Sequence, residues 1–235
     1  MKKIKIPDIG SGRTGEILEL TENLLKEYPE DVLIRFPDIQ SPLGVAELMW
    51  DDSFYISLLT DPGAVHILLK KITTFIISYI KELQGILGTR ANPCCFPHIW
   101  SSPEGYYIAD DTNSMVSPEL HLEYSVNYIN QITEAVGPVH YHSCTWSPIY
   151  FENIKKIKNT KTKNWSIIVS SDPLEILREF SENTFLAPHI HNMHIEDNVK
   201  KLGLHSEYEV VKYLLDNMQQ DITLYLHIYD DLLIK

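Results

Sequence analysis

The stretch Pro138-Val139-His140-Tyr141-His142-Ser143-Cys144, followed closely by Ser147-Pro148, decides the fold class that the sequence predicts. A short run of this composition is typical of a β-strand. A serine before a proline is typical of a helix start, because the serine oxygen can cap the helix and proline suits its first position. The stretch therefore predicts a strand that leads within a few residues into a helix.

The same succession recurs along the chain. Strand-like runs lie at residues 32–36, 105–109, 138–144, 165–170, 184–190 and 222–228. Amphipathic helical patterns lie at residues 14–28, 62–84, 118–135, 148–157, 173–181 and 207–219. The helix-start signal appears again at Asp61-Pro62, Ser117-Pro118 and Asp172-Pro173. This alternation predicts an α/β fold with a mostly parallel sheet covered by helices.

Two α/β architectures fit that alternation, a (β/α)8 TIM-type barrel and an open doubly wound sheet. An open nucleotide-binding sheet is expected to carry a glycine-rich phosphate loop after a strand. Gly10-Ser11-Gly12 follows no convincing strand, so we interpret it as a surface turn. The sequence therefore favours the barrel, in which the chemistry lies at the C-terminal ends of the strands.

Length and composition predict one soluble enzyme-sized unit. The 235 residues, 44% of them hydrophobic, suit a single domain over residues 1–235. The net charge of −12 argues against a nucleic-acid partner, because phosphate backbones repel an acidic protein. A small-molecule substrate is the expected ligand.

Cysteine content and hydropathy bear on location. Only three cysteines occur, and Cys94 and Cys95 are adjacent, so a disulfide scaffold is not expected and a reducing compartment fits. The N-terminus lacks the apolar region of a signal peptide. The most apolar window, residues 67–80, contains Lys70 and Lys71 and is shorter than a membrane span. We therefore expect a cytoplasmic protein without a membrane segment.

The strand at 138–144 also carries the first candidate site. Side chains alternate along a strand, so His140, His142 and Cys144 share one face, and Cys144 lies at the C-terminal end. His142 and Cys144 could both bind one Zn²⁺, with a third ligand from another strand. Alternatively, His142 is a hydrogen-bonded interior histidine and Cys144 a small buried hydrophobe. The spacing leaves both interpretations open.

Histidines near other strand ends are candidates for the third ligand. His189 and His191 share a face of one predicted strand, and His227 lies at the end of the last one. Each could instead transfer protons or bind a carboxylate near neutral pH, or be a capped surface residue.

Acidic and aromatic residues mark two further strand ends. Asp110 and Asp111 follow the strand 105–109, where they could bind a cationic group or act as a base, or simply cap the next turn. Trp165 opens the next strand but one, where a tryptophan could stack on a ligand or only pack.

Several motifs then occur in a familiar order. They are Pro37-Asp38-Ile39-Gln40-Ser41-Pro42-Leu43-Gly44, Asp61-Pro62-Gly63-Ala64-Val65-His66 before a long helix, Ile108-Ala109-Asp110-Asp111, Val116-Ser117-Pro118-Glu119, and His142-Ser143-Cys144. In this order, over roughly residues 14–230, the chain resembles the uroporphyrinogen decarboxylase superfamily. That superfamily has a (β/α)8 barrel and includes decarboxylases and zinc-dependent methyltransferases that move a methyl group between a corrinoid protein and a thiol.

The resemblance implies specific roles. The methyltransferases use a His-x-Cys pair as zinc ligands, which His142-Ser143-Cys144 matches, and a cysteine at the end of the last strand. Here His227 stands near that place, which also resembles a histidine of the decarboxylases, and Thr145 replaces the family's glycine. The implied protein is a methyl-group transferase with Zn²⁺ on His142, Cys144 and His227, and with its corrinoid on a partner protein. Asp111 and His140 are expected to have catalytic roles. The expected substrate-binding residues are Asp110, Trp165, His189 and His191.

Two alternatives accompany this expectation. A metal-free lyase of the decarboxylase type would need fixed positive charge for a substrate with many carboxylates, yet the chain has only Arg13, Arg35, Arg90 and Arg178. The family's first strand and its helix also have no counterpart, which implies a barrel incomplete at the N-terminus. Such a chain could be a non-catalytic binding or assembly subunit, or a homodimer that covers the exposed sheet edges.

Overall fold

The strands of this protein form one continuous parallel array. The computed structural model describes residues 3–50, 53–93, 104–144, 146–166, 173–180, 185–190, 202–218 and 227–228. The strands are β1 (Ile34–Arg35), β2 (Ala91–Asn92), β3 (Tyr106–Ala109), β4 (Val139–Ser143), β5 (Thr160–Ser166), β6 (Phe185–Ile190) and β7 (His227–Ile228). β3 to β7 pair in chain order, β1 pairs with β2, and a bridge between Gln40 and Ala109 joins the two groups. Every described pairing is parallel.

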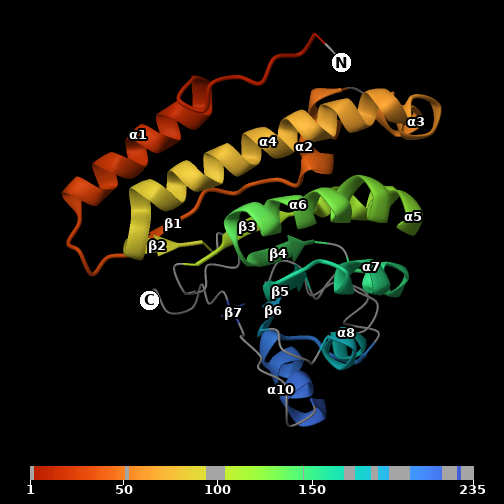
Figure 1. Cartoon of the computed structure of the whole chain (residues 1–235). Helices are drawn as coiled ribbons and strands as arrows, with labels where there is room; N and C mark the ends of the chain where they lie inside the picture. Colours follow the sequence, from red (N-terminus) through yellow and green to blue (C-terminus); the bar gives the residue numbers. More distant parts are fainter. Residues whose placement is uncertain are drawn as a thin grey trace.

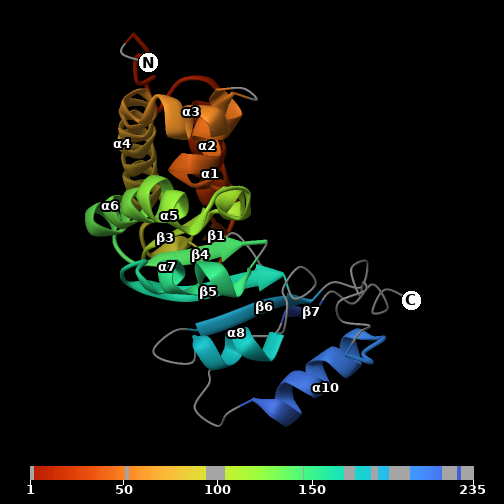
Figure 2. The same cartoon turned by 90° about the vertical axis from the view of Figure 1, so that its right-hand side faces the viewer.

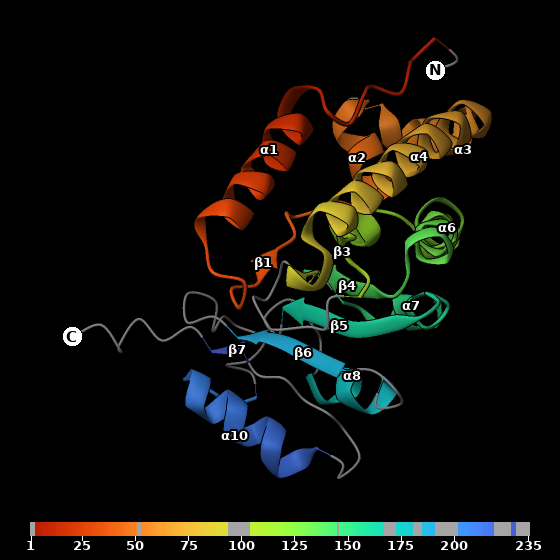
Figure 3. The same ribbon diagram turned by 60° about the vertical axis from the view of Figure 1, so that its left-hand side comes forward.

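Helices cover this array on several sides. They are α1 (Gly12–Glu27), α2 (Pro42–Met49), α3 (Phe54–Thr60), α4 (Pro62–Leu87), α5 (Pro118–His121), α6 (Asn127–Val136), α7 (Phe151–Lys155), α8 (Pro173–Glu179) and α10 (Glu207–Asn217). In Figure 1, α1 and α4 run side by side as an outer layer, and α5 and α6 lie between α4 and the strands. Figure 2 shows α8 and α10 beyond β6, at the other end of the molecule from α1 and α4. Figure 3 shows the same separation.

Helix starts follow the predicted capping signals in two of three described cases. The Asp61 carboxylate accepts a hydrogen bond from the Ala64 amide at 3.1 Å, and the Ser117 hydroxyl accepts one from Leu120 at 3.4 Å. Ser147 makes no such bond, and the helical segment that follows it begins as a 3₁₀ turn, Pro148–Tyr150. Asp172 lies outside the described residues. A further cap that the prediction missed, Ser41 to the Gly44 amide, starts α2.

The structure corrects the predicted element boundaries at three places. Helix α2, which begins at Pro42 within the segment that follows residue 37, was not predicted. β2 was not predicted, since two residues carry no detectable alternation. β5 begins at Thr160, five residues before the predicted start at Trp165, because its polar residues Thr162 and Asn164 are buried in the fold. Burial in the assembled sheet here overrides the weak local preference.

The predicted fold class is confirmed at the level of a parallel α/β protein. Among the described residues, the array runs from β2 to β7, and no pairing joins these two ends. The described strands therefore establish a parallel sheet, and they do not establish a closed eight-stranded barrel.

Helix α4 is the main core helix of the N-terminal half. Its length and composition are those of a membrane-crossing helix, and it alone among the described residues passes this test. Ten of its residues are buried, and it packs against α1, α2 and α6. A helix with one buried face that packs on other helices is typical of a globular domain, so we interpret α4 as an amphipathic helix of this fold.

Candidate metal centre

Three side chains that can bind metal gather where β3 and β4 end. The ligand atoms of Asp111, His142 and Cys144 all lie within 4.8 Å of one another. His142 Nε2 is 3.3 Å from Cys144 Sγ and 3.6 Å from Asp111 Oδ1. The structure thus brings the predicted pair His142 and Cys144 together, and adds Asp111, which the sequence suggested only in a supporting role.

Backbone pairing places these residues. Ala109 on β3 pairs with His142 on β4, and the Asp110 amide donates to the His142 carbonyl at 2.8 Å. The next residue, Asp111, opens a 3₁₀ turn, Asp111–Met115, and its Oδ1 accepts a hydrogen bond from the Cys144 amide at 2.7 Å. The carboxylate is therefore held against the C-terminal end of β4, which is the edge where parallel α/β enzymes place their chemistry.

Burial and charge set the protonation of the cluster. Partial burial of the sulfur, followed by the charge and hydrogen bond of Asp111, raises the pKa of Cys144 to about 12. Burial lowers the pKa of His142, although Asp111 and Asn164 act in the opposite direction. Partial burial raises the pKa of Asp38, whose charge also acts on His142 and Cys144. The cluster thus combines a neutral imidazole with a protonated thiol beside carboxylates.

These residues fit a divalent metal ion. Imidazole nitrogen, thiolate sulfur and carboxylate oxygen are the donors that zinc uses in proteins, and three protein ligands leave a position for substrate. The negative carboxylate that raises the pKa of Cys144 would be offset by a cation, which favours the thiolate. We find no comparable group of three such residues elsewhere in the part of the chain that the structure describes.

His142 is held from two sides. Its Nδ1 is hydrogen-bonded to Asn164 on β5, and its ring stacks against Tyr107 of β3 with the centroids 6.1 Å apart. Both neighbours are almost fully buried. The ring orientation is therefore set by β3 and β5 as well as by its own strand.

His140 lies two residues deeper on the same face of β4. Its Nδ1 is hydrogen-bonded to Thr162 Oγ1 at 3.0 Å, and burial lowers its pKa to about 4. The imidazole is therefore neutral at physiological pH. His140 is not one of the three clustered residues, because it lies two residues before His142 on β4 and its ring is bonded to Thr162 of β5.

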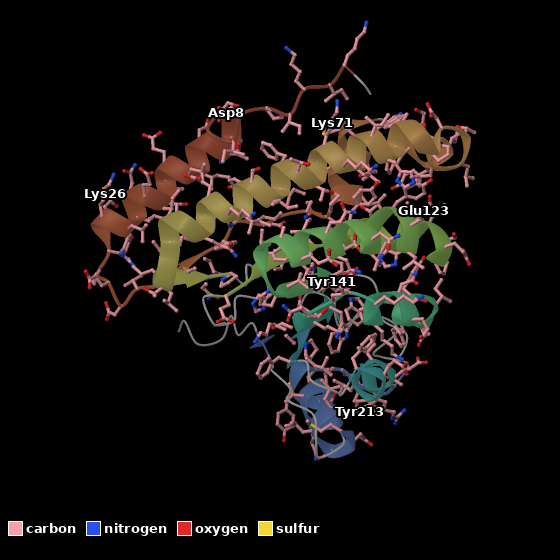
Figure 4. All side chains as sticks on the ribbon, in the orientation of Figure 1. Asp8, Lys26, Lys71, Glu123, Tyr141 and Tyr213 are labelled. Carbon is pink, nitrogen blue, oxygen red and sulfur yellow. The ribbon has the colours of Figure 1, made fainter. Side chains whose placement is uncertain are left out.

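Asp110 has a different environment from Asp111. Its carboxylate is fully buried and accepts hydrogen bonds from His121 Nε2 at 2.9 Å, Ser125 Oγ at 2.7 Å and the Tyr141 hydroxyl at 3.1 Å. Burial acts to raise the pKa of Asp110, but His121 and the hydroxyl donors outweigh it, so the pKa is lowered. Figure 4 shows Tyr141 just beneath the α5–α6 layer, which is where this network lies.

His121 and Ser125 were not predicted from the sequence as site residues. They are four residues apart and lie on one side of the helical segment formed by α5 and the π turn Leu122–Val126. Two polar residues at this spacing on an otherwise apolar helix face were a detectable signal for a buried partner. The π turn is itself a feature often found at functional sites.

Trp165 takes a packing position. It is fully buried, and its ring centroid is 5.5 Å from that of Trp146, which in turn contacts Phe151 and Phe180. Side chains alternate along β5, so Trp165 points away from the side on which Asn164 meets His142. The aromatic cluster fills the space between the sheet and α7 and α8.

The remaining histidines are placed by backbone alone. His189 pairs with Ser166 of β5 on one side and with His227 of β7 on the other. Ser166 directly follows Trp165, the residue that pairs with Ser143 of β4. This register brings them to the same end of the sheet as Cys144. Their roles as ligand and substrate-binding residues stay predictions, and His191 lies outside the described residues.

Comparison with known proteins supports the fold. No protein-family model and no curated protein sequence matches the chain. Among solved structures, a methyltransferase from Methanosarcina mazei is similar, with a TM-score of 0.69 and 14% identity over 95% of this chain and 61% of that one. The chain thus spans 61% of that protein's length. At this identity, the likeness establishes a shared fold.

Proposed function

We propose that this chain is a zinc-dependent methyl-group transferase of the uroporphyrinogen decarboxylase superfamily, with a barrel-type single domain. It would move a methyl group between a corrinoid, presented by a partner protein, and a thiol. The convergence of Asp111, His142 and Cys144 carries the proposal. The fold shared with a methyltransferase and the order of the sequence motifs support it.

The roles follow from the chemistry of each group. His142 would bind the metal through Nε2, Cys144 through its sulfur and Asp111 through its carboxylate, with His227 of β7 as a further predicted ligand. When bound, zinc supplies the positive charge that keeps a thiol substrate ionised near neutral pH. Asp111 also holds the Cys144 amide in place. Asp38, whose pKa is raised by partial burial, would accept the proton that the thiol releases.

Two of the four arginines, Arg90 and Arg13, are bound to groups of the N-terminal segment, which favours the transferase over a metal-free decarboxylase. Arg90 donates to the backbone carbonyls of Leu25, Tyr28 and Val32, which ties the end of α1 to β2. Arg13 pairs with Glu16 on the surface of α1. Both guanidinium groups thus serve the N-terminal helices, whereas a substrate with many carboxylates would need them at the site.

Metal analysis of the purified chain tests the proposal. We expect one zinc per chain in the wild type, and loss of it in Cys144→Ala and His142→Ala. His66→Ala, which removes an imidazole of α4 that is bonded to Tyr128 and Glu123, should keep the metal. Methylcobalamin with 2-mercaptoethanol then reports methyl transfer through the absorbance of the demethylated corrinoid. A wild type without stoichiometric zinc, matched by unaltered Cys144→Ala protein, would exclude the proposed function.

A further inference from the structure

Asn164 connects three neighbouring strands at the level of the candidate metal centre. It lies on β5, where the backbone register pairs it with His142 on β4 and with Ala187 on β6. Its side chain is 2% exposed, and that of His142 is 5% exposed. Both polar groups are thus removed from water, so each must find its hydrogen-bond partner inside the protein.

The Ala187 carbonyl fixes the orientation of the Asn164 amide. The Asn164 Nδ2 group donates to that carbonyl oxygen, which can only accept. The opposite amide orientation would set two acceptor oxygens against each other in a buried position. Asn164 Oδ1 must therefore be the atom that faces His142 Nδ1.

This amide orientation determines the tautomer of His142. An amide oxygen only accepts hydrogen bonds, so His142 Nδ1 must carry the proton that the bond needs. In the neutral ring, Nε2 then keeps its lone pair. That atom is the one that lies 3.3 Å from Cys144 Sγ and 3.6 Å from Asp111 Oδ1.

We propose that Asn164 is a positioning residue for the metal centre: by accepting from His142 Nδ1 while bonded to the Ala187 backbone, it presents the Nε2 lone pair to a metal ion. The effect on metal binding rests on the proposed zinc function, whereas the tautomer of His142 is a property of the metal-free chain. Partners of this kind on the second ring nitrogen typically change metal affinity 10- to 100-fold.

Two measurements on the same variants test the inference. Nitrogen-15 NMR of histidine-labelled, metal-free protein should show His142 protonated at Nδ1 in the wild type and a mixture of tautomers in Asn164→Leu. Competition with a chromophoric chelator should show zinc binding about 10- to 100-fold weaker in Asn164→Leu. Asn164→Asp keeps an acceptor oxygen for Nδ1 and should keep the Nδ1–H tautomer, but it sets a second oxygen against the Ala187 carbonyl and should therefore be less stable than the wild type. The tautomer of the wild type itself decides the inference if either variant folds poorly.

Thr162→Val is the matched control. Thr162 lies two residues earlier on the same face of β5 and bonds His140 instead of His142. Its loss should leave the zinc affinity and the His142 tautomer unchanged, and an equal effect of both variants would overturn the assignment to Asn164. Wild-type protein with the His142 proton on Nε2 would also overturn it. If the wild type shows the Nδ1–H tautomer but binds no zinc, only the proposed function falls.

Discussion

The two faces of the β4–β5 strand pair use polar residues in opposite ways. On one face, His142 and Asn164 lead to a cluster with Asp111 whose thiol and carboxylate stay partly accessible. On the other face, which is covered by helices, Tyr141 joins the fully buried network of Asp110. On the first face, the side chains of the cluster can bind a ligand. On the second face, both carboxylate oxygens of Asp110 accept hydrogen bonds from within the protein.

Asp110 and Asp111 show the contrast between adjacent residues. Successive side chains leave a strand end in different directions, so one carboxylate enters the helical layer and the other reaches the end of β4. The buried carboxylate accepts from the side chains of His121, Ser125 and Tyr141, and Ser41 also contributes, which is what a structural role requires. Asp111 accepts the Cys144 amide and stays partly exposed, so its carboxylate can still bind a cation.

Asp110→Ala should have the largest effect on stability. It leaves His121, Ser125 and Tyr141 with buried polar groups that have lost their shared acceptor. Removing one partner of a buried charged network costs about 3–5 kcal/mol of unfolding free energy. Urea denaturation measures this cost. Asp111→Ala is the matched control and should cost less than about 1 kcal/mol; similar losses in both variants would contradict the division of roles.

Lys163 allows a pH test of the helix-covered face. Its ammonium lies 5.2 Å from the centre of the Phe180 ring, and burial lowers its pKa from 10.5 to about 8. Below pH 8 both folded and unfolded chains carry the proton, so the cost of burying it is fully present. Between pH 8 and 10.5 only the unfolded chain keeps the proton, so this cost is relieved and stability rises with pH.

Lys163→Met should therefore be more stable than the wild type at pH 7, by at most about 3 kcal/mol. The difference should shrink as the pH rises through that window. Urea denaturation of both proteins at pH 7 and pH 10 measures it. The same pH dependence in the two proteins would show that the ammonium carries no desolvation cost.

These two faces also show what the sequence could predict. The alternation in residues 138–144 predicted β4 and the shared face of His142 and Cys144, because strand periodicity is a local property. Asp111 was placed only near the site, since its approach to β4 depends on strand pairing across 33 residues. The network of Asp110 with His121 and the early start of β5 escaped prediction for the same reason. Each depends on burial between elements that are distant in the chain.

Asp111→Ala should weaken metal binding on the accessible face. The variant keeps His142 and Cys144 but removes the proposed third ligand and the acceptor of the Cys144 amide. We expect zinc affinity to fall at least about tenfold, equivalent to about 1.4 kcal/mol, with the fold retained. Chelator competition measures the affinity, and circular dichroism checks the fold. Undiminished affinity would show that a different third ligand, such as His227, completes the site.

Tyr141→Phe should have a smaller effect on stability than Asp110→Ala, and the most local one. It removes one of several donors to Asp110 and keeps the ring, whose centroid is 6.1 Å from that of Trp146. A hydrogen bond to a buried carboxylate contributes about 1.5–3 kcal/mol, but His121 and Ser125 still hold Asp110, so we expect a loss near the lower bound. Zinc affinity should not change, because Tyr141 points away from His142 on β4. A variant with normal stability but weaker zinc binding would mean that the helix-covered network also controls the metal centre, and the two faces would then act as one site.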